Sequence, residues 1–147
     1  TKKLMHLLDT EKCYEVTAKE HEQLQSSFAA DYCEDHEGKV YIRDTFEKGY
    51  LMDPHTATCF KAYDTCRDMP LKTIVYSTAE WTKFSPVIAN ALTGETDAHD
   101  IDALESIARK AGITIPAMIS ELFEKEIAQK SVIEKGDIEQ EILAFLS

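Results

Sequence analysis

Residues Leu71 to Thr78 read Leu-Lys-Thr-Ile-Val-Tyr-Ser-Thr, and the prediction of the fold rests on this stretch. Its centre is β-branched or aromatic, and the run is apolar rather than alternating, which is typical of a strand covered on both faces in a parallel sheet. We therefore predict a strand at Leu71–Tyr76. The rest of the chain supplies almost no parallel neighbours, so we expect these strands in sequence before Thr1.

Helical signals fill most of the remaining chain. Thr17-Ala-Lys-Glu20 is a capping box, and Asp53-Pro54 places an N-cap residue and a first-turn proline at a helix start. Ser85-Pro86 begins a further helix that Gly94 ends, and three amphipathic helices follow between residues 96 and 147. The expected fold is therefore α/β, rich in helices, with one or two parallel strands.

Composition narrows the classes of function. The chain has 147 residues and carries 27 acidic against 16 basic side chains, a net charge of −11. Such a chain repels phosphates, so we expect neither nucleic acid nor an anionic membrane as a partner. No apolar run is long enough to span a bilayer. The oligomeric state does not follow from the sequence.

The four cysteines lack the C-x-x-C spacing of zinc sites and redox motifs. Their positions are Cys13, Cys33, Cys59 and Cys66. A domain of this size needs no disulfide bonds, so we expect reduced thiols and a cytoplasmic protein. Cys33-Glu-Asp-His36 is better explained as a polar turn than as half of a metal site, because no second Cys/His pair matches it. We predict no metal.

Two hydroxyl side chains, Ser77 and Thr78, follow the predicted strand directly. Ligands of open α/β sheets bind beyond the carboxyl ends of the strands. A hydroxyl can donate to an aromatic nitrogen or a phosphate without adding charge, which makes both residues candidate ligand contacts. Alternatively, they bond only to nearby backbone, as Ser and Thr often do in turns.

Two further polar residues are weaker candidates. His55 lies in the first turn of its helix, where the helix dipole disfavours an imidazolium, so it is either a neutral hydrogen-bonding group or a structural residue. Lys83 either attracts an anionic substrate or packs its stem near Phe84 at the surface. Asp53 is better explained by its structural role as an N-cap than by a functional one.

The two polar motifs together resemble threonine synthase, in the C-terminal third of that enzyme. Members of this family carry Asp-Pro-His-Thr-Ala at a helix start, as residues 53–57 do here after Gly49-Tyr-Leu51. They then carry Ser-Thr-Ala-His-Pro-Ala-Lys-Phe, of which this chain keeps Ser77-Thr-Ala79 and Lys83-Phe84. It departs at residues 80–82, which read Glu-Trp-Thr. The resemblance covers roughly residues 15 to 94.

The resemblance implies a pyridoxal phosphate enzyme of fold type II. Residues 1–94 would then belong to the large cofactor-binding domain, with residues 95–147 as a C-terminal helical extension. Thr78 best matches the hydroxyl that faces the pyridine nitrogen, and Ser77 is second. The implied reaction, a step of threonine biosynthesis, converts O-phospho-L-homoserine and water to L-threonine and phosphate. Lys83 and His55 are the weaker candidates for contacts with this substrate.

The same resemblance predicts that this chain does not act alone. In that family the Schiff-base lysine and the glycine-rich phosphate cradle lie upstream of the matched segment, so no catalytic residue is assigned in this chain. We expect it to work with the remainder of the same polypeptide, and to bind the cofactor weakly or not at all alone. Two alternatives stay open: a threonine-synthase-like phospholyase, suggested by the altered residues 80–82, and a non-catalytic acidic helical interaction module.

Overall fold

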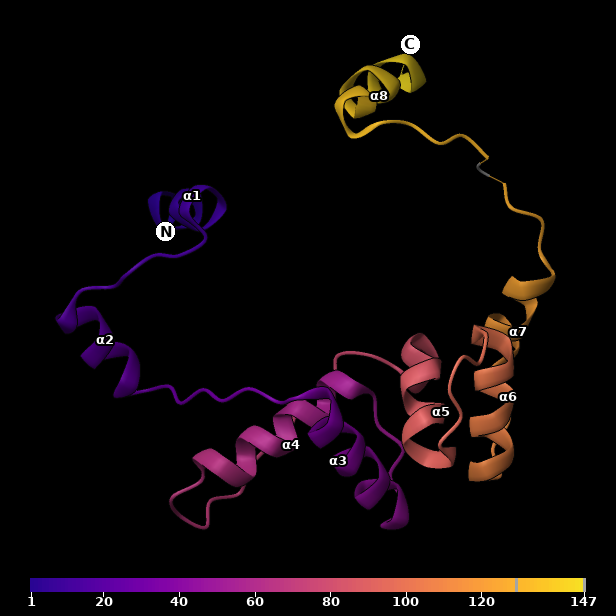
Figure 1. Cartoon of the computed structure of the whole chain (residues 1–147), viewed down its shortest axis with the longest axis horizontal. Helices are drawn as coiled ribbons and strands as arrows, with labels where there is room; N and C mark the ends of the chain where they lie inside the picture. Colours follow the sequence, from indigo (N-terminus) through magenta and orange to yellow (C-terminus); the bar gives the residue numbers. More distant parts are fainter. Residues whose placement is uncertain (129, 147) are drawn as a thin grey trace.

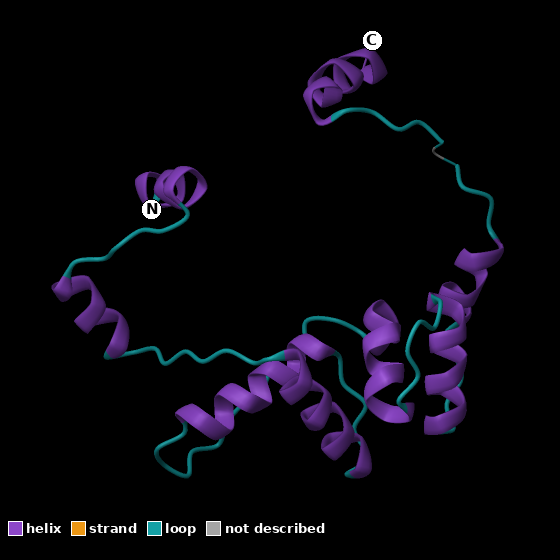
Figure 2. Cartoon of the chain, in the orientation of Figure 1, coloured by secondary structure: helices purple, strands orange, loops and turns teal. Residues whose placement is uncertain are grey.

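The computed structural model describes residues 1–128 and 130–146, which form helices joined by loops (Figures 1 and 2). The α-helices are α1 (Lys2–Glu11), α2 (Ala18–Gln25), α3 (Asp35–Glu47), α4 (Pro54–Cys66), α5 (Ser85–Thr93), α6 (Asp100–Ala111), α7 (Ala117–Glu124) and α8 (Ile138–Leu146). Two short 3-10 helices are η1 (Trp81–Phe84) and η2 (Lys135–Asp137).

The predicted α/β fold with parallel strands is wrong, because residues 1–128 and 130–146 contain helices and loops but no strand (Figure 2). The segment Leu71–Tyr76 is a loop between α4 and η1. Successive side chains of this segment alternate between a groove and solvent. Thr73 and Val75 line a groove against α3 and α4, whereas Ile74 and Tyr76 are 80% and 79% exposed.

The physical reason for this error lies in what β-propensity measures. Val, Ile and Tyr favour strands because they pack well on a pleated, half-buried surface, and a strand also needs neighbours that pair with its backbone. Here the surroundings of the segment are the helices α3 and α4, which use their own backbone groups internally. A strand-like composition thus occurs without a sheet in the part of the chain that the structure describes.

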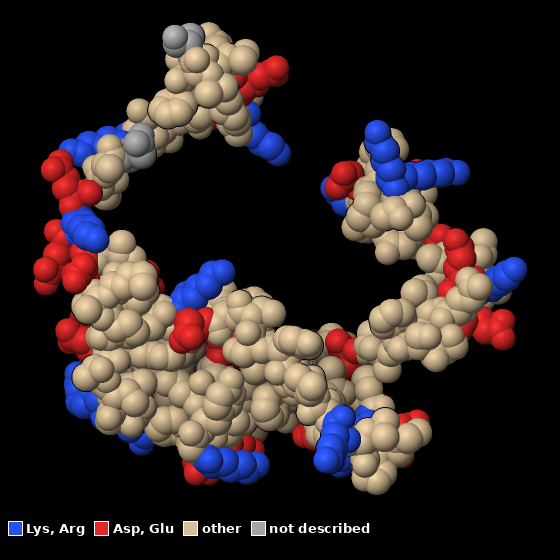
Figure 3. All heavy atoms as spheres, turned by 180° about the vertical axis from the view of Figure 1, so that it is seen from behind, with Lys and Arg blue, Asp and Glu red and all other residues tan. Residues whose placement is uncertain are grey.

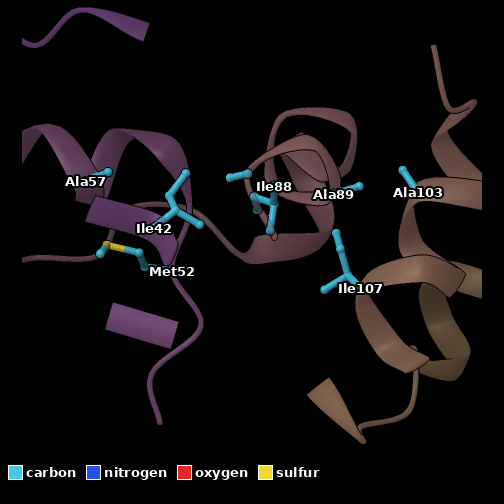
Figure 4. Close-up of a cluster of buried hydrophobic side chains, with 8 residues drawn as sticks. Ile42, Met52, Ala57, Ile88, Ala89, Ala103 and Ile107 are labelled. Atoms are coloured by element: carbon cyan, nitrogen blue, oxygen red, sulfur yellow. The ribbon is translucent and has the colours of Figure 1, made fainter. Parts of the chain in front are cut away.

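Four helices, α3 to α6, form the packed body of the molecule. In Figure 1, α5 lies between α3 and α6, and it packs against both, while α3 also packs against α4. Figure 4 shows the buried side chains that meet between these elements. This core cluster consists of Ile42, Met52, Ala57, Ile88, Ala89, Ala91, Ala103 and Ile107. The cluster contains residues from both sides of the predicted domain boundary between residues 94 and 95. This domain boundary stays a prediction.

Polar contacts supplement the core at the ends of these helices. The Ser85 hydroxyl, which is buried, donates to the backbone carbonyl of Asp100 at 3.2 Å and so ties the start of α5 to the start of α6. Lys61 of α4 lies 3.0 Å from the carboxylate of Glu37 on α3. The ion pair links α4, which carries the first motif, to α3.

Two arms extend from the body, α1 and α2 on the N-terminal side and α8 on the C-terminal side (Figure 1). Residues of α1, α2, α7 and α8 are exposed or half-buried. The predicted capping box at α2 is confirmed: the Thr17 amide donates to the Glu20 carboxylate at 2.9 Å, and the Glu20 amide donates to the Thr17 hydroxyl at 3.3 Å. Local sequence therefore specifies this helix without help from the body.

The predicted start of α4 and the predicted C-terminal end of α5 are also confirmed. Asp53 is the N-cap of α4 with Pro54 in its first turn, and Gly94 ends α5 with a φ of 79°, in the left-handed region that glycine tolerates. On the face that Figure 3 shows, charged side chains lie mainly along the arms and at the edges of the body. No helix in the described ranges is long and apolar enough to cross a membrane.

A matched pair of substitutions tests the corrected fold. Ile88 is fully buried in α5, so Ile88→Ala should lower the free energy of unfolding by about 2–5 kcal/mol. Ile74 is 80% exposed, so Ile74→Ala should change it by less than about 0.5 kcal/mol. Urea denaturation followed by circular dichroism measures both values. Equal losses would mean that residues 71–76 are buried as the predicted strand requires.

Candidate functional site

A buried carboxylate organises the start of α4. The Asp53 side chain is fully buried, and its Oδ1 accepts hydrogen bonds from the backbone amides of His55 at 2.9 Å and Thr56 at 3.3 Å. Its Oδ2 accepts a short hydrogen bond from the Thr56 hydroxyl. Because Asp53 follows a turn and precedes Pro54, its backbone is extended and its side chain can reach over the first turn of the helix.

The Thr56 hydroxyl links this helix start to the second motif. Thr56 is 2% exposed, and its Oγ1 lies 3.2 Å from the Oγ of Ser77, 21 residues further along the chain. Ser77 Oγ lies equally far, 3.2 Å, from the backbone carbonyl oxygen of Ala79. The two sequence motifs therefore meet in the structure through side-chain hydroxyls.

The environment of Asp53 favours its ionised form. Burial alone would raise the pKa of this carboxyl group, but the hydrogen bonds from the Thr56 hydroxyl, the two backbone amides and the His55 ring outweigh the burial. The pKa of Asp53 therefore lies below its usual value of 3.8. A buried negative charge at a helix N-terminus also has a favourable interaction with the helix dipole.

His55 and Phe84 form a second contact between the motifs. The His55 ring lies 4.6 Å from the Phe84 ring, centre to centre, with the planes tilted by 55°. His55 Nδ1 lies 3.2 Å from Asp53 Oδ1, so a proton on Nδ1 gives a hydrogen bond to the carboxylate. The His55 side chain remains 60% exposed, which leaves its outer edge accessible to a ligand.

Lys83 lies against Phe84, an arrangement that is compatible with either of its two predicted roles. Its Nζ lies 5.4 Å from the centre of the Phe84 ring, as expected for a lysine stem that packs on a neighbouring aromatic side chain. The residue is nevertheless exposed, so its ammonium group is accessible at the same surface as His55. Both candidate substrate contacts thus lie against the Phe84 ring.

Thr78 differs from Ser77 in having no hydrogen-bond partner for its side chain among the residues that the structure describes. Thr78 is exposed, and its neighbour Ser77 contacts Thr56 of α4. The loop is continued by Glu80, also exposed, and by Trp81, which packs against the core cluster. One departure from the threonine synthase pattern therefore acts in the core, whereas Glu80 faces solvent.

Thr56 entered the sequence-based predictions only as part of the motif at residues 53–57, and its polar role was missed. The signal that could have found it is its position three residues after the N-cap Asp53, where a side chain can return to the cap.

A separate cleft of about 410 Å³ lies between α3, α5 and the loop before α6, lined by Cys33, Ile42, Val87 and Asp97 among others. Ser77 and Thr78 do not line this cleft.

The buried carboxylate should make stability depend on pH. Because its pKa in the folded state lies below the unfolded value, ionised Asp53 stabilises the fold above about pH 3.8, and this contribution is lost as the pH falls through the folded value. Asp53→Asn keeps an N-cap but loses the charge, so it should lower the free energy of unfolding by about 1.5–3 kcal/mol at pH 7.

Denaturation of both proteins across the acid range measures this difference, which should shrink toward low pH. Asp68→Asn, at an exposed position just beyond α4, is the control and should stay within about 0.5 kcal/mol of the parent. A difference between parent and Asp53→Asn that is independent of pH would show that the charge of Asp53 contributes nothing.

Comparison with known proteins shows what the chain is similar to. No family model matches the chain. The protein "Threonine synthase-like 1" of Homo sapiens is 34% identical over 90 residues, which are 60% of this chain, and its namesake from Macaca fascicularis is 36% identical over the same share. The protein of that name from Mus musculus is 39% identical over 72 residues, 48% of this chain.

The matched part spans about 12% of the length of the human and macaque relatives and 10% of the mouse relative. The predicted resemblance is therefore confirmed in its coarser form: over more than half of its length, the chain is similar to threonine synthase-like proteins.

Proposed function

We propose that this chain forms part of a pyridoxal-phosphate-dependent, threonine-synthase-like enzyme that converts O-phospho-L-homoserine and water to L-threonine and phosphate. The observation that carries the proposal is the contact between the two motifs, in which the Thr56 and Ser77 hydroxyls lie 3.2 Å apart and Thr78 remains accessible. The similarity to threonine synthase-like proteins supports it independently.

The side chains at this contact fit one end of the cofactor. A pyridine nitrogen can accept a hydrogen bond from a neutral hydroxyl, and Thr78 offers a hydroxyl that is exposed and unbonded within the described part of the chain. Thr78 would hold the ring nitrogen, with Ser77 beside it. When bound, the cofactor withdraws electrons from the substrate and so makes loss of phosphate and addition of water possible. A hydroxyl orients the ring without adding a charge beside it.

His55 and Lys83 are the proposed substrate side of the site. Both are exposed and both lie against Phe84, so a phosphorylated substrate could reach the Lys83 ammonium group and the outer edge of the His55 ring. The buried Asp53 carboxylate orients the imidazole through Nδ1. In this arrangement the chain binds and orients the substrate, while the catalytic lysine and the phosphate cradle come from the remainder of a longer polypeptide.

Exposed apolar side chains support the proposed contact with further polypeptide. Leu71, Ile74 and Tyr76, which are 64% to 80% exposed, lie in the loop that leads directly to Ser77. Burial of such side chains against another part of the protein is favourable at about 25 cal/mol per Å² of apolar surface. The surface beside the hydroxyl pair is therefore suited to contact with the part of the protein that completes the site.

The altered residues favour a second candidate, a threonine-synthase-like phospholyase. Glu80 is exposed two residues after Thr78, and a carboxylate there would repel a phosphate group unless a cation pairs with it. Trp81 is anchored on the core cluster, which holds this loop at the surface of the body. In such an enzyme the residues that contact the substrate would differ, while those that contact the cofactor would be retained. It would release phosphate from the substrate but would not add the water that forms threonine.

The two candidate reactions are distinguished by their products. The full-length polypeptide that carries this chain, supplied with pyridoxal phosphate and O-phospho-L-homoserine, should release phosphate and threonine in equal amounts if it is a threonine synthase. Phosphate without threonine would identify a phospholyase. If neither product forms, the proposed activity is wrong, and the interaction-module alternative becomes the better explanation of this helical chain.

The cofactor contact can be tested separately from turnover. In the full-length polypeptide, Thr78→Val should weaken pyridoxal phosphate binding by about threefold to tenfold, the effect of one lost hydrogen bond. The control is Thr73→Val, at a threonine of the same loop whose hydroxyl bonds to the Leu71 carbonyl oxygen. Equilibrium titration followed by cofactor fluorescence gives both dissociation constants, and equal values for Thr78→Val and the parent would contradict the contact.

A further inference from the structure

The contact between Thr56 and Ser77 is unusual because one of its two side chains lies among the core helices and the other on an exposed loop. Thr56 is 2% exposed and Asp53 is fully buried, whereas Ser77 is exposed. Thr56 therefore connects a buried charge to a surface loop through a single hydroxyl. Such a group can transmit the fixed position of the helix start to the loop.

The number of available protons decides the direction of these hydrogen bonds. Ionised Asp53 can only accept, so the single proton of the Thr56 hydroxyl goes to Asp53 Oδ2. Thr56 Oγ1 then offers Ser77 only a lone pair. The Ser77 proton has two acceptors at the same distance of 3.2 Å, Thr56 Oγ1 and the Ala79 carbonyl oxygen. The hydrogen bond between the two hydroxyls therefore requires that the Ser77 proton be directed at Thr56 Oγ1 rather than at the Ala79 carbonyl oxygen.

This count of protons and acceptors separates the roles of the adjacent Ser77 and Thr78 hydroxyls. Ser77 could donate to a ligand only by giving up a bond within the protein, whereas the Thr78 hydroxyl has no such bond to any described residue. Ser77 is thus suited to hold the loop, and Thr78 to meet the ligand. The two residue types alone leave these roles open, because both side chains carry a hydroxyl at neighbouring positions, and only the family resemblance ranked Thr78 before Ser77.

We infer that Thr56 is a positioning residue, whose hydroxyl, oriented by Asp53, holds Ser77 and thereby fixes the loop that presents Thr78. This role rests on the proposed function only in its last step, since the coupling of Thr56 to Ser77 exists without any ligand. Thr56 does not touch the cofactor. Its effect on binding would pass through the position of Ser77 and the backbone that joins Ser77 to Thr78.

A double-mutant cycle on the 147-residue chain tests the coupling without any cofactor. If the two hydroxyls interact, the unfolding equilibrium constants for Thr56→Val, Ser77→Ala and the double variant should depart from simple multiplication by about threefold or more. If Thr56 only stabilises its own helix, the effects of the two single substitutions on the unfolding equilibrium constant should simply multiply in the double variant. The matched control is Thr58→Val, since the Thr58 hydroxyl bonds to the His55 carbonyl oxygen in the same helix, and its cycle with Ser77→Ala should be multiplicative.

The second readout is pyridoxal phosphate affinity in the full-length polypeptide. Thr56→Val should weaken binding by about threefold to tenfold, as one lost hydrogen bond would, whereas Thr56→Ser keeps the hydroxyl and should restore affinity to within about twofold of the parent. Thr58→Val should leave the affinity unchanged. If Thr56→Val does not fold, Ser77→Ala removes the same contact from the exposed side and should weaken binding as much.

The outcomes separate this inference from the proposed function. Coupling in the cycle, with no cofactor binding by the parent protein, would support the Thr56–Ser77 interaction and overturn the proposed cofactor site. Cofactor binding by the parent with a multiplicative cycle, or with equal affinity in Thr56→Val and Thr56→Ser, would overturn the positioning role. Coupling together with weakened binding in Thr56→Val and recovery in Thr56→Ser would support both.

Discussion

The burial of one carboxylate, that of Asp53, is the constraint on which the candidate site depends. A buried charge is tolerated only when hydrogen bonds replace the water it has lost, and Asp53 obtains them from the first turn of α4 and from the side chains of Thr56 and His55. Satisfying this charge therefore fixes the rotamers of both side chains. Each of them in turn meets the second motif, Thr56 at Ser77 and His55 at Phe84.

The body of four helices makes this arrangement possible. Met52, directly before Asp53, is buried in the same cluster as Ile42 and Ile88, and this packing excludes water from the helix start. Trp81, within the second motif and at the start of η1, packs against the same cluster. Both motifs are therefore anchored on one core, and the exposed pair of hydroxyls that opens the second motif lies close to this anchor. The four candidate site side chains, Ser77, Thr78, His55 and Lys83, are all exposed next to these anchored elements.

Much of the helical framework could be predicted because its signals are local. The capping box at Thr17, the Asp53-Pro54 start and the glycine that ends α5 each act through backbone groups within a few residues. The strand at Leu71–Tyr76 could not be decided in this way, since a strand exists only with a partner, and composition reports merely that its side chains suit a half-buried surface. The position of Thr73 and Val75 in a groove beside α3 and α4, with Ile74 exposed, depends on neighbours far away in the sequence.

The sequence by itself determined the residue types of the site and their local settings: an acidic N-cap before proline, a histidine in the first turn, and two adjacent hydroxyls. It also determined the resemblance to threonine synthase, which the relatives confirm in its coarser, threonine-synthase-like form. Only the tertiary structure decided that Thr56 reaches Ser77 and that Thr78 remains accessible. The reason is that hydrogen bonds between side chains 21 residues apart depend on how the helices pack, and packing is a property of the whole core rather than of any motif.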